Sequence, residues 1–189
     1  MNQKNLEGEF LIISHFLYES AISKAQCELI LAETDWSHKE DGSYMKQGKS
    51  VVNAKIRKTD VAFVPYYSPI GCILQSHITA ANAYKWKYDI RSFQDIQIAH
   101  YQVDNHYDWH TDTSWSNENN MQRKLSAVIM LSDPSDYEGG LLELKNVELP
   151  KLSQGTLIVF PSIMQHRVTK VTKGNRYTAV AWAVGPAFR

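Results

Sequence analysis

The sequence predicts a mainly β fold, a sandwich or jelly roll, with two or more helices buttressing one outer face. From residue 93 onward the segments are short and end at turn signals such as Gly139-Gly140 and Gly174-Asn175. Many short strands with few helices are typical of closed or two-sheet antiparallel folds. The predicted strands span residues 94–102, 106–110, 124–132, 141–146, 155–160, 165–171 and 176–184.

Helical spacing is confined to the first half of the chain. Ser20 can cap a helix over residues 20–34, whose apolar side chains approximate one face. Ser68 followed by Pro69 predicts a second helix over residues 69–84, because proline suits the first helical position. The other elements predicted here are a strand at 9–14, a polar loop at 37–50 and a strand at 56–64.

Length and composition exclude several classes of function. The 189 residues suit a single domain, with a helix-and-strand part at 1–92 and the β-rich core at 93–189. Twenty basic and twenty acidic residues cancel, so we expect no nucleic acid and no anionic membrane as partner. The apolar run at 10–17 is too short to span a bilayer. Cys27 and Cys72 lie in apolar segments, which predicts reduced core residues of a cytoplasmic protein.

His110-Thr111-Asp112 is the first candidate for a functional motif. Side chains two positions apart on a strand point to the same face, so His110 and Asp112 can meet at one point. An imidazole and a carboxylate suit iron, zinc or manganese better than calcium. On its own the pattern is weak, because it occurs by chance in many chains.

A third ligand has to come from elsewhere among the seven histidines. His77 lies on the apolar face of the second helix and is expected in the core or at its boundary. His106 shares the strand face of His110 but is roughly 13 Å away along the strand. His166 stands at a strand entry in the same β-rich half. Two His and one Asp form the facial triad of non-haem iron(II) oxygenases.

Arg176 is the second unusual feature. On a strand it shares one face with Thr178, Val180 and Trp182. An arginine on the inner face of an apolar strand is costly unless an anion meets it, and its fork suits a carboxylate. That carboxylate is either Glu138 or Glu143 of the protein itself, or a small molecule beside the metal.

These motifs together resemble the iron(II)- and 2-oxoglutarate-dependent dioxygenases, and among them the prolyl 4-hydroxylase-like family. The resemblance covers residues 93–185 and implies a double-stranded β-helix (jelly roll, cupin-like) for the catalytic core. The matching segments are Tyr101 with Tyr107 and His110-Thr111-Asp112, the strand 123–132, the turn and strand 137–144, Phe160-Pro161 through Val168, and Gly174 through Tyr177 with Trp182.

The resemblance implies the roles of the site residues. His110, Asp112 and His166 would bind Fe(II), and Arg176 would hold the distal carboxylate of 2-oxoglutarate. Tyr101 and Thr178 would add hydroxyl contacts. O2 is then the oxidant, and ascorbate is a candidate reductant. Hydroxylation is favoured over halogenation because Asp112 is present.

One position departs from the family pattern. Where members often place a tyrosine that touches the distal carboxylate, this chain has Met130. A different position, six residues after Arg176, concerns the substrate. The branch of the superfamily that demethylates nucleic acids carries a second arginine there, and this chain has Trp182.

The resemblance favours hydroxylation of prolyl residues in a protein or peptide, with release of succinate and CO2. A free amino acid or another small metabolite is the alternative substrate. A non-catalytic jelly-roll binding module is a further alternative, since the fold hosts many functions. Trp109, Trp115 and Asp108 flank the metal strand and either line a substrate groove or pack elsewhere. The polar segment 37–58 is either a surface connection or a lid over a peptide.

Overall fold

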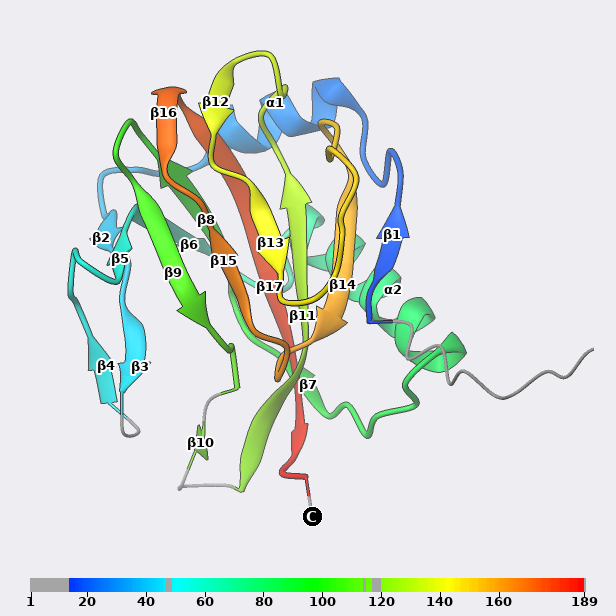
Figure 1. Cartoon of the computed structure of the whole chain (residues 1–189). Helices are drawn as coiled ribbons and strands as arrows, with labels where there is room; N and C mark the ends of the chain where they lie inside the picture. Colours follow the sequence, from blue (N-terminus) through cyan, green and yellow to red (C-terminus); the bar gives the residue numbers. More distant parts are fainter. Residues whose placement is uncertain (1–13, 47–48, 114, 117–119, 189) are drawn as a thin grey trace, which may run out of the picture.

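The computed structural model describes residues 14–46, 49–113, 115–116 and 120–188 (Figure 1). Its two helices are α1 (Lys24–Glu33) and α2 (Pro69–Tyr84). Its strands are β1 (Phe16–Tyr18), β2 (Glu40–Asp41), β3 (Tyr44–Lys46), β4 (Lys49–Val51), β5 (Arg57–Lys58), β6 (Asp60–Val64), β7 (Ser92–Phe93), β8 (Ile96–Tyr101), β9 (His106–His110), β10 (Trp115–Ser116), β11 (Met121–Met130), β12 (Tyr137–Gly139), β13 (Leu142–Leu144), β14 (Leu157–Pro161), β15 (His166–Val168), β16 (Val171–Gly174) and β17 (Arg176–Pro186).

The strands form two main sheets that face each other. The larger sheet has the order β1-β14-β11-β17-β8-β6-β2, with β10 added beside β11 and β7 beside β17. The smaller sheet has the order β13-β15-β9-β5. In Figure 1 the smaller sheet stands in front of the larger one, and both helices lie behind the larger sheet. The predicted jelly roll with helices on one outer face is therefore confirmed.

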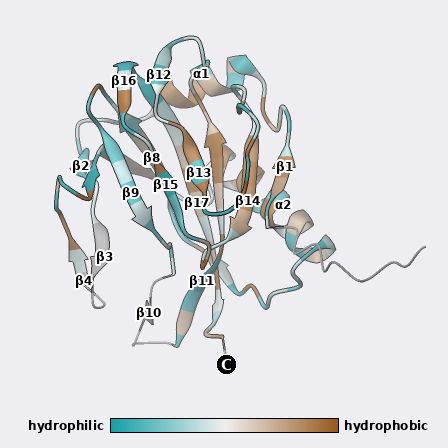
Figure 2. Ribbon diagram, viewed as in Figure 1, coloured by the Kyte–Doolittle hydropathy of each residue, from teal (hydrophilic) through white to brown (hydrophobic). Residues whose placement is uncertain are grey.

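The core lies between the larger sheet and the helices. Leu74 and Ile78 of α2 and Cys27 of α1 are fully buried in one apolar cluster with residues of β8, β11, β14 and β17. Figure 2 shows the hydrophobic colour concentrated on β14 and on the upper half of β11. Burial of this apolar surface is the main favourable term that holds the helices on the sheet.

Strand β17 divides its side chains between the core and the space between the sheets. Tyr177, Ala179 and Ala181 join the apolar cluster under the helices. Arg176, Thr178, Val180 and Trp182 face the smaller sheet, where they line a cavity. This alternation is the one that the sequence predicts, and it carries an arginine into the interior.

Helix α2 lies where the sequence predicts it, and helix α1 begins later than predicted. Ser68 accepts a hydrogen bond from the Gly71 backbone N–H, and α2 begins at Pro69. For α1 the cap is Ser23, because Ser23 and Gln26 form a reciprocal capping box. Ser20 instead adopts a positive φ of 54° in the turn before the helix.

Other predictions of secondary structure need correction. Residues 9–13 of the strand predicted at 9–14 lie outside the described residues, and β1 begins only at Phe16. The segment 37–50, predicted as a loop, contains β2, β3 and part of β4, and β3 pairs with β4 as a hairpin. Strands β7, β10 and β12 were not predicted, since each has only two or three residues.

The two cysteines are both free, but only one lies in the core. Cys27 is fully buried, as predicted. Cys72 is exposed, because the buried face of α2 runs through Leu74, Ile78 and Ala81 instead. In the part of the chain that the structure describes, neither helix has the length and hydrophobicity needed to cross a bilayer.

Candidate active site

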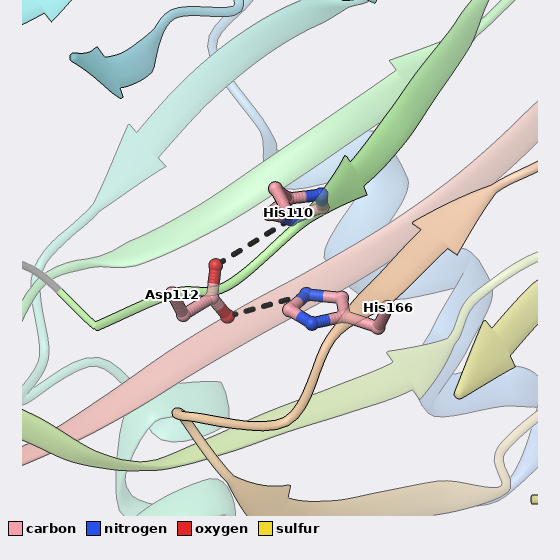
Figure 3. Close-up of side chains that lie close together, drawn as sticks. All are labelled: His110, Asp112 and His166. Atoms are coloured by element: carbon pink, nitrogen blue, oxygen red, sulfur yellow. Dashed lines mark ion pairs between the residues drawn. The ribbon is translucent and has the colours of Figure 1, made fainter. Parts of the chain in front are cut away.

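Three side chains converge in the space between the two sheets. His110 ends β9, and Asp112 follows it by two residues. His166 opens β15, which pairs with β9 so that His166 is the direct neighbour of His110. The Nε2 atom of His110 is 3.6 Å from Oδ1 of Asp112, and Nε2 of His166 is 3.5 Å from Oδ2. Figure 3 shows both rings directed at the two oxygens of the carboxylate.

The far nitrogen of each imidazole fixes its tautomer. Nδ1 of His110 lies 2.7 Å from the carbonyl oxygen of Asp108, and Nδ1 of His166 lies 2.9 Å from that of Met164. A carbonyl oxygen can only accept, so each Nδ1 carries the proton and donates it. In the neutral ring, the Nε2 lone pair is then free and faces Asp112. This is the orientation that a metal-binding histidine needs.

Burial keeps His110 neutral. The side chains of His110, Asp112 and His166 are only 11%, 9% and 6% exposed. Burial, reinforced by the charge of His166, lowers the pKa of His110 from 6.5 to about 3. At neutral pH its Nε2 is thus available to a cation without first losing a proton.

Asp112 is held in place by two donors. The Ser126 hydroxyl donates to Oδ2 at 2.7 Å, and the Trp182 indole N–H donates to the same oxygen at 2.9 Å. Burial alone would raise the pKa of Asp112, but His166, His110, Arg123 and the Ser126 hydroxyl together hold it well below its usual range. The carboxylate is therefore a preorganised anion.

The donor set fits a divalent transition metal. The three ligand atoms lie within 4.8 Å of one another and come from two imidazoles and one carboxylate. This composition is the 2-His-1-carboxylate set used by non-haem Fe(II) proteins, and it leaves coordination positions open. Within the described residues no other group of this kind occurs.

Arg176 is buried beside this triad without a counterion. Its side chain belongs to the largest fully buried ones, at 1% exposure. Nη2 makes a weak contact of 3.8 Å with Sδ of Met130, while Nε and Nη1 have no hydrogen-bond partner in the described chain. An unpaired buried guanidinium is costly, so the arrangement fits a carboxylate that arrives from solution.

The two protein carboxylates considered as partners for Arg176 are engaged elsewhere. Oε1 of Glu138 lies 3.1 Å from Nζ of Lys173, and Oε2 of Glu143 lies 2.6 Å from Nε of Arg167. The interpretation of Arg176 as half of an internal ion pair with either residue is therefore wrong. The stem of Arg176 also needs the tight turn before β13, since a Cβ on Gly140 would lie 2.8 Å from its Cδ.

One cavity of about 210 Å³ contains all six residues that the sequence singled out. These are His110, Asp112, His166, Arg176, Tyr101 and Thr178. The guanidinium of Arg176 lies over the Tyr101 ring, with Cζ 5.2 Å from the ring centroid. Thr178 is the neighbour of Arg176 on the same face of β17 and lines the same cavity. Sequence reasoning thus found the side chains at the floor of the cavity.

The walls of the cavity contain two arginines, Arg57 and Arg123, whose part in the site the sequence did not indicate. Tyr107, which the resemblance already includes, stacks on His110 with ring centroids 3.4 Å apart, and Cζ of Arg57 lies over the Tyr107 ring at 4.6 Å from its centroid. Arg123 lies over the Trp182 ring at 3.7 Å. Arg57 reaches the site because it is the register partner of Tyr107 across β5 and β9. The sequence does not show which strands pair, so it gives no indication of this contact.

Trp109, which precedes His110 on β9, does not line the metal cavity. Trp109 is 38% exposed, contacts Arg167 at 4.8 Å and borders a different pocket, beside β13. Asp108 is also exposed and does not line the metal cavity. Both therefore fail as residues of a groove at the metal, and the side chain of Trp115 lies outside the described residues.

The comparisons with known proteins agree with this geometry. Residues 96–184 match the model of the 2OG-Fe(II) oxygenase superfamily. A PKHD-type hydroxylase of Picosynechococcus is 43% identical over 79 residues, which cover 40% of this chain and 35% of the relative. A PKHD-type hydroxylase of Thermosynechococcus vestitus is 42% identical over 92 residues, covering 46% and 41%. The match thus spans about two fifths of the length of these curated relatives.

Solved structures share the fold over nearly the whole chain. A viral collagen prolyl hydroxylase from Paramecium bursaria Chlorella virus-1 has a TM-score of 0.68 at 17% identity, covering 91% of this chain and 96% of the other. A Trichoplax adhaerens prolyl hydroxylase, in complex with a peptide fragment of hypoxia inducible factor, has 0.69 at 19%, covering 90% and 83%. The triad and the unpaired Arg176 fit Fe(II) and 2-oxoglutarate, after which the superfamily is named. Residues 96–184 therefore belong to the 2OG-Fe(II) oxygenase superfamily, on the fold of the prolyl hydroxylases.

Proposed function

We propose that this chain is an Fe(II)- and 2-oxoglutarate-dependent hydroxylase that acts on prolyl residues in a protein or peptide. The reaction consumes one C–H bond, one 2-oxoglutarate and one O2. One oxygen atom enters the C–H bond as hydroxyl. The other enters succinate as the keto acid loses CO2, so the four electrons that O2 needs come in equal shares from the two substrates.

The observation that carries this proposal is that a metal-binding triad and an unpartnered arginine share one cavity. Three metal-binding groups from β9 and β15 converge on one point, and the counterion-free Arg176 enters the same cavity from β17. A metal alone would leave the arginine unexplained, and a carboxylate alone would leave the triad unexplained. A carboxylic acid that also chelates the metal accounts for both, as 2-oxoglutarate does.

Each residue then has a role in binding. His110, Asp112 and His166 would hold Fe(II), which supplies the oxidation chemistry when bound. Arg176 would bind the distal carboxylate of 2-oxoglutarate through its unpaired Nε and Nη1. Tyr101 and Thr178 border the same place and would add their hydroxyls. Met130 would contribute shape without a hydrogen bond, which leaves more of the binding to Arg176.

Two aromatic side chains beside the triad support a prolyl substrate. Tyr107 is stacked on His110, and the Trp182 indole N–H donates a hydrogen bond to Asp112. Both line the cavity and add aromatic edges to its wall, while Arg57 and Arg123 lie over their rings. The relatives with PKHD-type names and the solved prolyl hydroxylases support the same substrate class. Ser43 and Ser50 border the cavity from the segment 37–58, which supports its role as a lid.

The test is direct. Wild-type protein with Fe(II) and 2-oxoglutarate, without O2, should develop a weak visible charge-transfer band. In air with proline-rich peptides it should release succinate, and the peptides should gain one oxygen atom by mass spectrometry. His110→Ala and Asp112→Ala should lose both signals, whereas Glu28→Ala on the exposed face of α1 should keep them. No band with the wild-type protein would favour a non-catalytic binding module instead.

A further inference from the structure

The walls of the metal cavity carry more positive charge than the metal and the keto acid require. Arg57, Arg123 and Arg176 line the cavity, and Asp112 is the sole acidic residue among the described residues that line it. Three positive charges therefore stand against one negative charge. Fe(II) and doubly charged 2-oxoglutarate cancel each other when both are bound. An excess of two positive charges remains in a largely buried space, and Arg176 is already assigned to the keto acid.

Arg57 is the least compensated of these side chains. The residue is 7% exposed. Its Nη1 donates to the backbone carbonyl of Ser43 at 2.7 Å, and its Nε has no hydrogen-bond partner in the described chain. The guanidinium lies 4.6 Å above the Tyr107 ring. Neither a backbone carbonyl nor an aromatic face neutralises a full charge, so Arg57 retains unused binding capacity.

No protein carboxylate fills this gap. None of the ion pairs found among the described residues involves Arg57 or Arg123. On the far side of Arg57 a separate pocket contains Asp41 and Asp60. Asp60 is already paired with Lys39 at 2.8 Å. Neither Asp41 nor Asp60 forms an ion pair with Arg57, and Arg57 also lines the metal cavity.

Arg123 faces the same space from the opposite sheet. Its Nε donates to the side chain of Gln94 at 2.7 Å, and its guanidinium lies on Trp182. Burial lowers the pKa of Arg123, Asp112 and Tyr107 oppose this effect, and the charge of Arg57 adds a smaller lowering. The two arginines therefore repel each other across the cavity. A bound anion between them would relieve that repulsion.

We propose that the primary substrate presents a carboxylate to Arg57, with Arg123, which lines the cavity from the larger sheet, adding to the attraction. This deepens the proposed hydroxylase function and rests on it. The carboxylate comes from an Asp or Glu beside the oxidised residue of a peptide, or from the α-carboxylate of a free amino acid. Both sources share the chemistry that Arg57 recognises, and the experiment separates them.

Peptide binding is measured anaerobically, with Fe(II) and 2-oxoglutarate present, so that affinity is separated from turnover. The first series consists of acetylated and amidated prolyl peptides that differ only in Glu, Gln or Lys next to the proline, on either side. The second pair is L-proline and L-prolinamide. Wild-type protein is compared with Arg57→Gln, Arg57→Lys and Arg91→Gln. The last is a matched control, because Arg91 is exposed and paired with Asp89.

Wild-type protein should bind a Glu peptide at least about tenfold more tightly than its Gln counterpart, and the Lys peptide most weakly, as expected for a desolvated charge pair. Arg57→Gln should reduce the ratio of the Glu to the Gln affinity to near one. Arg57→Lys should retain part of that ratio, because the charge persists while the planar fork and its contact with the Tyr107 ring are lost. Arg91→Gln should leave it unchanged. A mere structural role of Arg57 would weaken all peptides alike in both Arg57 variants.

Preference for L-proline over L-prolinamide, dependent on Arg57, would support the proposal with a free amino acid as the source. Equal affinities for the Glu, Gln and Lys peptides and for proline and prolinamide, including no measurable binding of any, would overturn it. So would a charge preference that survives in Arg57→Gln. Failure of the hydroxylase function itself would be seen separately, as a missing charge-transfer band in wild-type protein before any peptide is added.

Discussion

At the scale of single residues, the site combines groups that the sequence identifies with groups that it conceals. His110, Asp112, His166 and Arg176 stand out because their chemistry is out of place in apolar strands. Arg57 does not, because it lies in a polar segment where an arginine is unremarkable. Its importance arises from the contact with Tyr107 across two strands, and such a contact is a property of the folded chain.

The hydroxyl of Ser126 is expected to tune the metal affinity. It donates to Oδ2 of Asp112 at 2.7 Å and also contacts the Ser162 hydroxyl at 2.9 Å. Ser126→Ala removes one of two donors to this oxygen, while the Trp182 indole remains. Groups that hold a metal ligand are typically worth about 10-fold or more in metal affinity. We therefore expect Fe(II) affinity to fall by about tenfold.

The measurement is a titration of the metal-free protein with Fe(II) under anaerobic conditions. Ser132→Ala is the matched control, since it removes a buried serine hydroxyl that bonds to backbone away from the cavity. Equal metal affinities in Ser126→Ala and the wild type would show that the Trp182 bond alone holds the carboxylate.

Arg176 should lower the stability of the protein that lacks its ligand. It is buried with two unpartnered nitrogens, and a buried charge without a partner is costly. Arg176→Met keeps the volume and removes the charge. We expect the free energy of unfolding of the metal-free protein to rise by about 1 kcal/mol or more. The further stabilisation that 2-oxoglutarate gives to the Fe(II)-bound protein should at the same time decrease, because the distal carboxylate loses its partner.

Chemical denaturation with and without 2-oxoglutarate measures both effects. Arg91→Met, at an exposed arginine, controls for a general gain from added hydrophobicity. A loss of stability in ligand-free Arg176→Met would mean that the guanidinium already has a partner that offsets its burial.

At the scale of elements, the sequence predicts those helices whose ends are set by neighbouring residues. The helix at 69–84 is correct to the residue, because Ser68 and Pro69 specify its start and its apolar face is continuous. The helix at 20–34 begins late, because two serines compete and the capping box with Gln26 decides. The hairpin of β3 and β4 and the short strand β2 were not predicted, and β2 pairs with β6 through a contact distant in sequence. β5 falls within the strand predicted at 56–64, but its pairing with β9 could not be predicted.

Gly42 links these strands to the cavity. A Cβ at this position would lie 2.5 Å from Nε of Arg57 and 2.4 Å from Cγ2 of Thr59. The obstructing atoms belong to side chains, so the guanidinium of Arg57 can move aside. We therefore expect Gly42→Ala to weaken binding of Glu peptides with little loss of global stability.

The effect of Gly42→Ala should be absent in an Arg57→Gln background, because the two substitutions act through one contact. Peptide affinities of the two single variants and the double variant measure the coupling. Additive effects of the two substitutions would show that Gly42 acts through Thr59 or the backbone instead.

At the scale of the whole molecule, the site exists only where the two sheets face each other. The smaller sheet supplies both histidines, and the larger one supplies Arg176, Ser126 and Trp182. Alternation on β17 explains how one strand serves the core with one face and the cavity with the other. The sequence predicts this alternation and the class of fold. It does not predict which strands become neighbours, because pairing depends on the closure of the whole barrel.

The same burial that keeps the site ready for a metal should make the metal-free protein sensitive to acid. The pKa of His110 falls from 6.5 to about 3 on folding, chiefly through burial. As the pH drops below about 6.5, the unfolded chain binds a proton at His110 and the folded chain does not, until about pH 3. The unfolded state therefore binds more protons across this window, and the free energy of unfolding must decrease as the pH falls. Asp112 acts in the same direction, since its lowered pKa gives stability that is lost in acid.

Denaturant titrations of metal-free protein between pH 7 and pH 4 should reveal this slope, which for one proton is at most about 1.4 kcal/mol per pH unit. His110→Gln cannot take up the proton, so its stability should depend less on pH in the window where His110 titrates. His38→Gln, which changes an exposed histidine of the polar segment, should retain the slope of the wild type. If the free energy of unfolding of His110→Gln and of the wild type falls with pH at the same rate, other groups cause the acid sensitivity. A flatter curve for His110→Gln alone would show that the neutral imidazole needed for metal binding is maintained at the expense of stability in acid.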